Sequence, residues 1–259
     1  MSNIARIFWN GGFNSTFRIL ELSRYDALTI EAIYISSNSQ QEGSVLNTIK
    51  KVKSLLLSDS QFKASFAELT VINLENIPHN KAISEAYRNI NTIYPIDSEI
   101  EYLARYAHAR GERIELTLEN LGSAHLYKEL AAPNFEKVKK SGGRAYYILS
   151  PDNNKDFYTL FSNFYFPASI FDMTQRDMWQ RAREKHSDTV LLKSWFCTMP
   201  IKDEPCGVCQ ACTKVVNAKM RFRLTAKAFR RSQRIKKNPL LKNYYKVKEK
   251  VKQLINSMH

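Results

Sequence analysis

The sequence predicts an α/β protein with a doubly wound, mainly parallel sheet. Short apolar or β-branched runs alternate with longer stretches of helical periodicity from the first residues onward, and no internal repeat or low-complexity linker interrupts them. The chain has 259 residues and is 44% hydrophobic. That is enough to bury a substantial core in one large domain, or in one domain with an appendage.

The first third of the chain supplies three strands and two helices. The apolar run "IARIFW" (4–9) ends at Gly11-Gly12 and predicts a buried strand followed by a turn. Helical spacing begins at Ser15, and a second strand is expected over 28–36. A helix over 44–57 and a strand over 68–75 follow; the helix places four apolar residues on one face, Val45, Ile49, Val52 and Leu56.

Farther along, residues 98–131 are expected to be largely helical, and 144–150 to form a strand after the "SGG" turn. Past Cys212, the basic segment up to Lys237 is helix-compatible. Asn238-Pro239 then predicts the start of another helix. This helix carries an apolar stripe made of Leu240, Tyr244, Val247, Val251 and Leu254. We expect the stripe to pack on the body of the protein. The alternative is that it docks a second copy of the chain, as in a homodimer, or another partner.

Charge is unevenly distributed along the chain. The net charge is +14, and the residues from Lys214 onward hold 15 Lys and Arg against one acid, Glu249. The preceding part is therefore neutral. The basic segment suits a nucleic acid or an acidic protein partner; the alternative is a solvated helical face that keeps the protein soluble.

These shifts in composition divide the chain into three expected parts. An α/β domain spans 1–195, a cysteine-rich segment spans 196–213 and a basic helical extension spans 214–259. There is no apolar run long enough to cross a membrane and no secretion signal at the start, so we expect a cytoplasmic protein with no membrane partner.

All four cysteines lie within the stretch "CTMPIKDEPCGVCQAC", as Cys197, Cys206, Cys209 and Cys212. Disulfides are not expected in a cytoplasmic chain. Four thiolates can surround one Zn²⁺ tetrahedrally, and Gly207 permits the tight turn between two of them. We therefore predict a structural zinc site, because four cysteines leave no open position. An iron–sulfur cluster or four buried free thiols are the alternatives.

The turn "NGGFNST" (10–16) joins the first strand to the first helix. Backbone N–H groups of such a turn, together with the positive end of the helix dipole, can bind an anion. Gly11 and Gly12 lack Cβ atoms, so a phosphate can approach the main chain, and the hydroxyls of Ser15 and Thr16 can cap the helix or donate to phosphate. A plain turn would also select Asn and Gly.

Taken together, the turn and the cysteines resemble a known family. "N-G-G-F-N-S" at 10–15 is similar to the PP-loop, S-G-G-x-D-S, of the ATP pyrophosphatase superfamily. The cysteine pattern around "PCGVC" looks like the zinc site of the 7-cyano-7-deazaguanine synthases, the QueC family, and "FPASIFDMTQRDM" (166–178) is loosely similar to the segment that precedes zinc there. The resemblance covers residues 4–213.

This resemblance implies a PP-loop fold of the HUP, adenine nucleotide alpha hydrolase-like type, with ATP at the carboxyl ends of the strands. It also implies a ligase that adenylates a carboxylate, 7-carboxy-7-deazaguanine or a related one, for amide and then nitrile formation in queuosine biosynthesis. Mg²⁺ would offset charge on the departing pyrophosphate. The implied ATP contacts are Asn10, Gly11, Gly12, Asn14, Ser15 and Thr16; no catalytic side chain is assigned.

Two positions depart from the PP-loop pattern: Asn10 replaces its first Ser and Asn14 replaces its Asp. An Asn carbonyl is a weaker Mg²⁺ ligand than a carboxylate. The family's basic motif after a mid-chain Pro is not evident around Pro95. The alternative is therefore a degenerate relative that binds nucleotide or nucleic acid without catalysis, and a third reading is another PP-loop reaction such as tRNA thiolation.

Overall fold

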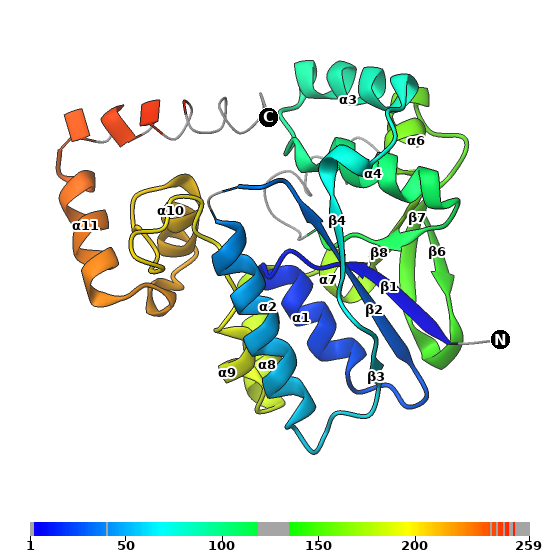
Figure 1. The fold of residues 1–259 in the computed structure, drawn as a ribbon, viewed down its shortest axis with the longest axis horizontal. Helices are drawn as coiled ribbons and strands as arrows, with labels where there is room; N and C mark the ends of the chain where they lie inside the picture. The colour runs from blue at the N-terminus through cyan, green and yellow to red at the C-terminus, as the bar shows by residue number, and fades with distance from the viewer. Residues whose placement is uncertain are drawn as a thin grey trace.

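The computed structural model describes residues 3–39, 41–118 and 135–238, with 240, 241, 243–245, 247, 248 and 251 beyond them. These residues form an α/β fold in which an eight-stranded, mainly parallel sheet is covered by helices on both faces (Figure 1). The predicted α/β class with a mainly parallel sheet is confirmed.

The parallel part of the sheet has β1 at its centre. β1 pairs on one side with β2, which in turn pairs with both β3 and β4, and on the other side with β5, which pairs with β8. The strands are β1 (Ile4–Phe8), β2 (Thr29–Ser36), β3 (Ser65–Phe66), β4 (Thr70–Asn73), β5 (Ile114–Glu115) and β8 (Phe164–Pro167).

A hairpin makes the sheet mixed. β6 (Phe135–Lys139) and β7 (Ala145–Leu149) are antiparallel to one another, and β7 is antiparallel to β8. The turn between them contains Gly142 and Gly143, both with positive φ, which the expected "SGG" turn requires.

Helices on the two faces enclose two separate cores. One core lies under α1 (Phe13–Leu22), α2 (Glu42–Leu57), α8 (Gln175–Glu184) and α9 (Asp188–Leu191) and includes the four cysteines. The other lies under α3 (Lys81–Ile93), α4 (Glu99–Arg110) and α6 (Lys155–Phe161) (Figure 1). The short α7 (Ala168–Phe171) follows β8 directly.

The connections to the two neighbours of β1 diverge at the carboxyl end of this strand. The chain leaves β1 through α1 on one face to reach β2, whereas it reaches β5, the other neighbour of β1, after α3 and α4 on the opposite face. Ligands of open α/β sheets bind where the connections diverge in this way, outside the carboxyl ends of the strands. The Gly11-Gly12 turn follows the carboxyl end of β1 and lies at this point.

Most of the expected strands and helices are present. The strands expected at 4–9, 28–36 and 144–150 are β1, β2 and β7, and the helix over 44–57 is α2, whose four predicted face residues are buried. The expected strand over 68–75 is shorter, because a turn of 3-10 helix begins at Leu74.

The expected long helix over 98–131 is wrong for the described residues that follow Arg110. α4 ends at Arg110, where Gly111 adopts a left-handed conformation (φ 65°), and β5 follows. Residues 119–131 of that expectation lie outside the described residues.

The basic C-terminal segment is also less regular than expected. It divides into α10 (Gln210–Asn217), a 3-10 turn (Arg221–Arg223) and α11 (Ala226–Lys236), because the side chain of Thr225 caps a new helix by accepting from Ala228 N–H.

Asn238 caps the following residues as predicted, since its side-chain oxygen accepts from the N–H groups of Leu240 and Leu241. However, Leu240, Tyr244, Val247 and Val251 are exposed, so the expectation that this stripe packs on the body is wrong for the described residues. Leu254 lies outside them. No helix in the described part of the chain has the length and apolarity needed to cross a membrane.

Candidate functional site

The four cysteines predicted to bind metal converge on one point in the structure. Their sulfur atoms all lie within 4.8 Å of one another and are fully buried. Cys197 and Cys209 have sulfurs 4.0 Å apart, and those of Cys206 and Cys212 are 3.8 Å apart. Zn–S bonds of about 2.3 Å at tetrahedral angles place sulfurs about 3.8 Å apart. The cluster can therefore hold one metal ion, and its spacing fits zinc.

Backbone N–H groups surround the sulfurs and favour their ionised form. Cys206 N–H donates to Cys197 Sγ (3.2 Å), Gly207 N–H donates to Cys212 Sγ (3.3 Å), and Cys212 N–H donates to Cys209 Sγ (3.4 Å). Cys206 Sγ accepts from Val208 and Cys209 N–H, both at 3.3 Å. Every sulfur thus accepts at least one N–H, which stabilises a thiolate.

The thiols also act on one another. Hydrogen bonding to the Cys197 thiol, and then to those of Cys206 and Cys212, lowers the pKa of Cys209. The pKa of Cys197 is raised, first by its hydrogen bond with Cys206, and that of Cys212 is raised, first by its hydrogen bond with Cys197. Four thiolates this close would repel strongly without a cation, because like charges in contact disfavour ionisation of the group. The arrangement is therefore suited to a dication at its centre.

Gly207 fixes the turn between two ligands and the position of α11. Its φ is 80°, and a Cβ atom there would lie only 2.0 Å from the carbonyl oxygen of Ala228 in α11. Arg231 of the same helix donates to the carbonyl oxygens of Cys206 (2.7 Å) and Pro205 (3.0 Å). The basic helix is thus held directly against the cysteine turn.

The glycine turn has the backbone geometry expected of a close-approach site. Gly11 is left-handed (φ 68°), and a Cβ there would meet the backbone of Val45 at 3.4 Å. Gly12 is the N-cap of α1 and has no side-chain cap. The backbone N–H groups of Phe13, Asn14 and Ser15, in the first turn of α1, have no acceptor among the described residues.

Asn10 closes part of this turn. Its side-chain oxygen accepts from the Gly12 N–H (3.0 Å) and from the Ser15 hydroxyl (3.0 Å). A Cβ on Gly12 would lie 2.8 Å from the same oxygen. Asn10 therefore occupies the place that an anion on these two donors would take.

Asn14 and Thr16, which are also expected at the ATP site, have different surroundings. The side-chain oxygen of Asn14 is buried and has no hydrogen-bond partner in the described chain. Thr16 is fully buried, and its hydroxyl accepts from the indole N–H of Trp9 (3.1 Å). The Thr16 hydroxyl is thus engaged in the core beneath the turn.

The cysteine cluster and the glycine turn are physically linked. Trp195, two residues before Cys197, donates its backbone N–H to the carbonyl oxygen of Gly11 (2.8 Å). The guanidinium of Arg223 lies over the rings of Phe13 (4.5 Å) and Phe196 (4.6 Å). The segment that carries the metal ligands therefore supports the turn at the start of α1.

Glu99 is an acidic residue at this site that the sequence did not single out. It begins α4, and its carboxyl lies near the side chain of Asn10. Burial, and then the nearby charge of Asp97, raise the pKa of Glu99 to about 7, although the Asn10 side chain opposes the shift. Burial and the Glu99 charge also raise the pKa of Tyr102. No sequence pattern distinguished Glu99 from the other acids of this region.

We expect Glu99 to make stability depend on pH. A carboxyl whose pKa rises from 4.5 to about 7 on folding holds its proton more tightly in the folded state. Its contribution to stability is therefore present below about pH 4.5 and is lost as the pH rises to about 7. Glu99→Gln removes this loss, so urea unfolding should show the variant gaining about 2 kcal/mol on wild type between pH 5 and pH 8. Glu136→Gln, exposed on β6, is the matched control, and an equal gain there would contradict the assignment.

No protein-family model matches the chain, and no curated protein matches it. Support for a function therefore comes from the fold, the site geometry and the resemblance of the turn and the cysteines.

Proposed function

We propose that this protein binds ATP at the Gly11-Gly12 turn and uses it to adenylate a carboxylate, as in the QueC-like ligases that its turn and cysteines resemble. The observation that carries the proposal is the position of the turn: it follows β1 at the point where the connections to β2 and β5 diverge, and the segment bearing the four cysteines is hydrogen-bonded to it. The proposal includes a PP-loop type of fold and a structural zinc ion.

The described residues fit a phosphate chain in this place. Three unpartnered backbone N–H groups (Phe13, Asn14 and Ser15) point from the first turn of a helix, whose dipole favours negative charge. The unpaired oxygen of Asn14 is suited to a donor on the ligand or to a metal-bound water. Carboxylate oxygen is a poor leaving group, and adenylation converts it into a good one.

Glu99 would supply the Mg²⁺-binding carboxylate that the PP-loop pattern has at position 14, where this chain has Asn. It is the acid near Asn10, beside the turn, and Mg²⁺ prefers carboxylate oxygen. When bound, Mg²⁺ would offset the charge developing on pyrophosphate. Residues of this chain then hold and orient the phosphates, and the substrate expected from the resemblance is a deazapurine carboxylate.

Asn10→Ser is expected to raise the affinity for ATP. The substitution removes the side-chain oxygen that accepts from Gly12 N–H, and so frees that donor for phosphate. We expect about a fivefold to tenfold lower Kd by isothermal titration calorimetry, the value of one charge-assisted hydrogen bond. Asn163→Ser, just before the amino end of β8 and so at the opposite edge of the sheet, is the control. Unchanged or weaker ATP binding by Asn10→Ser would show that phosphate does not use the Gly12 donor.

The activity is tested directly by following ATP conversion to AMP and pyrophosphate with 7-carboxy-7-deazaguanine and ammonia. Product formation that is abolished by Gly12→Arg supports the ligase. If the wild-type chain forms no more AMP than Gly12→Arg does, the catalytic part of the proposal is wrong. The nucleotide-binding part is then tested by the affinity measurements.

The exposed basic surface of α11 supports a second candidate function, the binding of nucleic acid. Lys227, Arg230, Arg234 and Lys236 form no ion pair with a carboxylate in the described part of the chain. Binding to tRNA through several phosphates should weaken steeply with salt, and Arg230→Glu/Arg234→Glu should flatten that dependence, whereas Lys50→Glu on α2 should not. Salt-independent or absent binding would end this candidate.

A further inference from the structure

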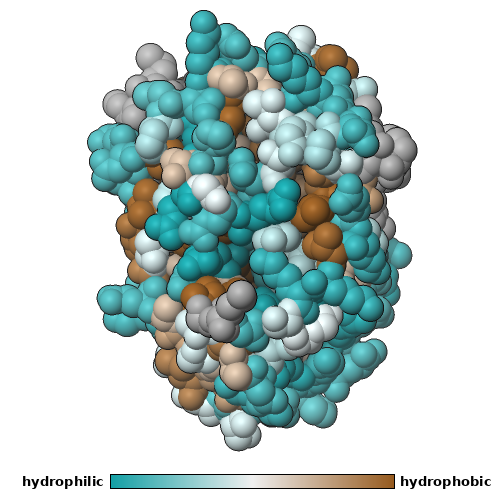
Figure 2. All heavy atoms as spheres, turned by 90° about the vertical axis from the view of Figure 1, so that its right-hand side faces the viewer, coloured by the Kyte–Doolittle hydropathy of each residue, from teal (hydrophilic) through white to brown (hydrophobic). Residues whose placement is uncertain are grey.

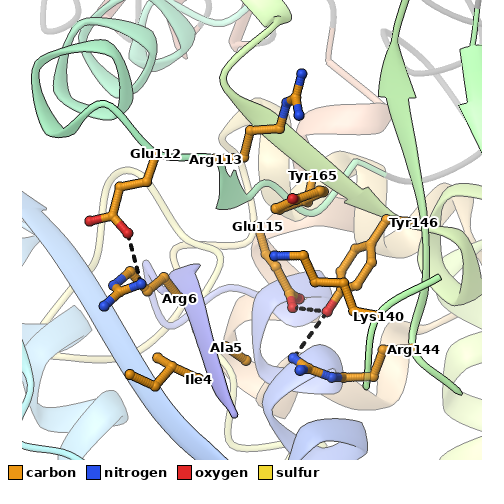
Figure 3. A pocket seen from close by; sticks show the side chains of 10 residues that line it. All are labelled: Ile4, Ala5, Arg6, Glu112, Arg113, Glu115, Lys140, Arg144, Tyr146 and Tyr165. Carbon is orange, nitrogen blue, oxygen red and sulfur yellow. Dashed lines mark hydrogen bonds and ion pairs between the residues drawn. The ribbon is translucent and has the colours of Figure 1, made fainter. Parts of the chain in front are cut away.

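A polar pocket lies at the opposite end of β1 from the glycine turn. Figure 2 views the molecule from the side at which β1 begins, and the side chains on this face are mainly hydrophilic. Its volume is about 180 Å³, with room for several water molecules. It forms beside Ile4–Arg6, the first part of β1, which has no partner residues in β5 because these two strands pair only at Ile7. Figure 3 shows the side chains that converge there from β1, β5, β7 and the residues around them.

The central feature of this pocket is a buried arginine without an anionic partner. Arg144 is only 3% exposed. Its guanidinium donates to the carbonyl oxygen of Ser141 (3.2 Å), to the hydroxyl of Tyr146 (3.3 Å) and to the side-chain oxygen of Asn3, all of them neutral acceptors. It forms no ion pair with a described carboxylate. Because a guanidinium has five N–H donors and three are used, one remains on each terminal nitrogen.

The acids that line the pocket are already matched by other arginines. Glu115 pairs with Arg18 (2.7 Å), which α1 contributes from outside the pocket, and it also accepts from Tyr146. Glu112 pairs with Arg6 (2.7 Å). Burial of an unbalanced cation costs free energy, so an anion near Arg144 would be stabilised.

Lys140 supplies a second cation at the mouth of the pocket. It is exposed, makes no ion pair with a described residue, and its ammonium lies 4.0 Å from the centre of the Tyr165 ring. In Figure 3 its side chain reaches across the pocket above the Glu115–Tyr146 contact. Arg113, at the rim near Tyr165, donates to the Ser162 carbonyl and likewise makes no ion pair with a described residue.

From this geometry we propose that the pocket is a binding site for a phosphate group, either free phosphate or the phosphate of a small metabolite. Arg144 is its buried anchor, with one remaining N–H donor on each terminal nitrogen for phosphate oxygens. Lys140 closes the mouth over the ligand. The site is separate from the proposed ATP site, because β1 lies between them.

The test is calorimetric titration of inorganic phosphate, and in parallel of glycerol phosphate, into the full chain at constant ionic strength. Lys140→Gln changes only an exposed side chain and should weaken binding about fivefold or more. Lys139→Gln, the exposed neighbour that does not line the pocket, is the matched control and should bind as wild type does. Tighter binding of glycerol phosphate than of phosphate identifies a phosphorylated metabolite as the source; the reverse identifies the free ion.

Two further variants distinguish phosphate binding in this pocket from phosphate binding at the glycine turn. Arg144→Gln, if its circular dichroism shows a folded chain, should lose phosphate binding, and Gly12→Arg should keep it. Any of three results would overturn the proposal. The first is no heat of binding at millimolar phosphate, and the second is equal weakening by Lys139→Gln and Lys140→Gln. The third is loss of binding with Gly12→Arg but not with Lys140→Gln.

Discussion

Replacing Gly207 by alanine is expected to unfold the cysteine-rich segment and release its metal. A Cβ atom at this position would lie 2.0 Å from the Ala228 carbonyl oxygen, which is backbone and cannot rotate away. The φ of 80° adds strain for any L-residue. Relief requires α11 to leave the cysteine turn, with loss of both hydrogen bonds from Arg231. We expect a loss of more than about 4 kcal/mol in the free energy of unfolding.

Gly143→Ala is the matched control for this prediction. Gly143 has nearly the same φ, 78°, but a Cβ there would meet nothing within 4 Å. It should therefore cost only about 1 kcal/mol, the value of the backbone strain alone. Similar losses for the two variants, measured by urea unfolding, would contradict the close packing of α11 on the cysteine turn.

Cys209→Ser is the second substitution with a large expected effect. Serine keeps the side chain's size and caps helices well, so the N-cap of α10 that Cys209 now provides should survive. The loss should therefore come from the metal, and we expect less than about 0.2 equivalents bound and a destabilisation of more than about 4 kcal/mol.

A chelator serves as the independent control for the cysteine variant. It should lower the melting temperature of the wild-type chain to that of Cys209→Ser, and should leave the variant unchanged. Plasma mass spectrometry on chain purified without added metal should find about one equivalent of zinc. If the chelator leaves the melting temperature of the wild-type chain unchanged, and the chain contains less than half an equivalent of zinc or iron, the four sulfurs hold no ion.

The cysteine cluster could be predicted from sequence because its ligands are local. Three of them lie within seven residues, and Gly207 marks the turn between two of these. The position of the glycine turn was also predictable, since it follows the first apolar run. The sequence could not predict that the Asn10 side chain closes this turn, because the closure depends on the rotamer of one side chain.

Contacts between distant parts of the chain were beyond the sequence pattern. Glu99 reaches Asn10 only because α4 packs on the face opposite α1. Arg18 and Glu115 are 97 residues apart in sequence, and β5, which carries Glu115, is too short to show strand periodicity. The apolar stripe after Asn238 predicted burial, but periodicity indicates a helical face without indicating what covers it.

The link between the two sites gives the cysteine cluster a role beyond its own segment. Through Trp195 and Arg223 it supports the turn at the start of α1, so loss of metal should also disturb the turn. Nucleotide affinity and metal content are therefore expected to fall together in Cys209→Ser.

The most direct test of the central claim is a crystal structure of the chain grown with a non-hydrolysable ATP analogue and Mg²⁺. We predict phosphate density against the N–H groups of Phe13, Asn14 and Ser15, with the Asn10 side chain turned away from Gly12. A structure in which the analogue is absent, or bound elsewhere while Asn10 still accepts from Gly12 and Ser15, would contradict the assignment of this turn as a nucleotide site.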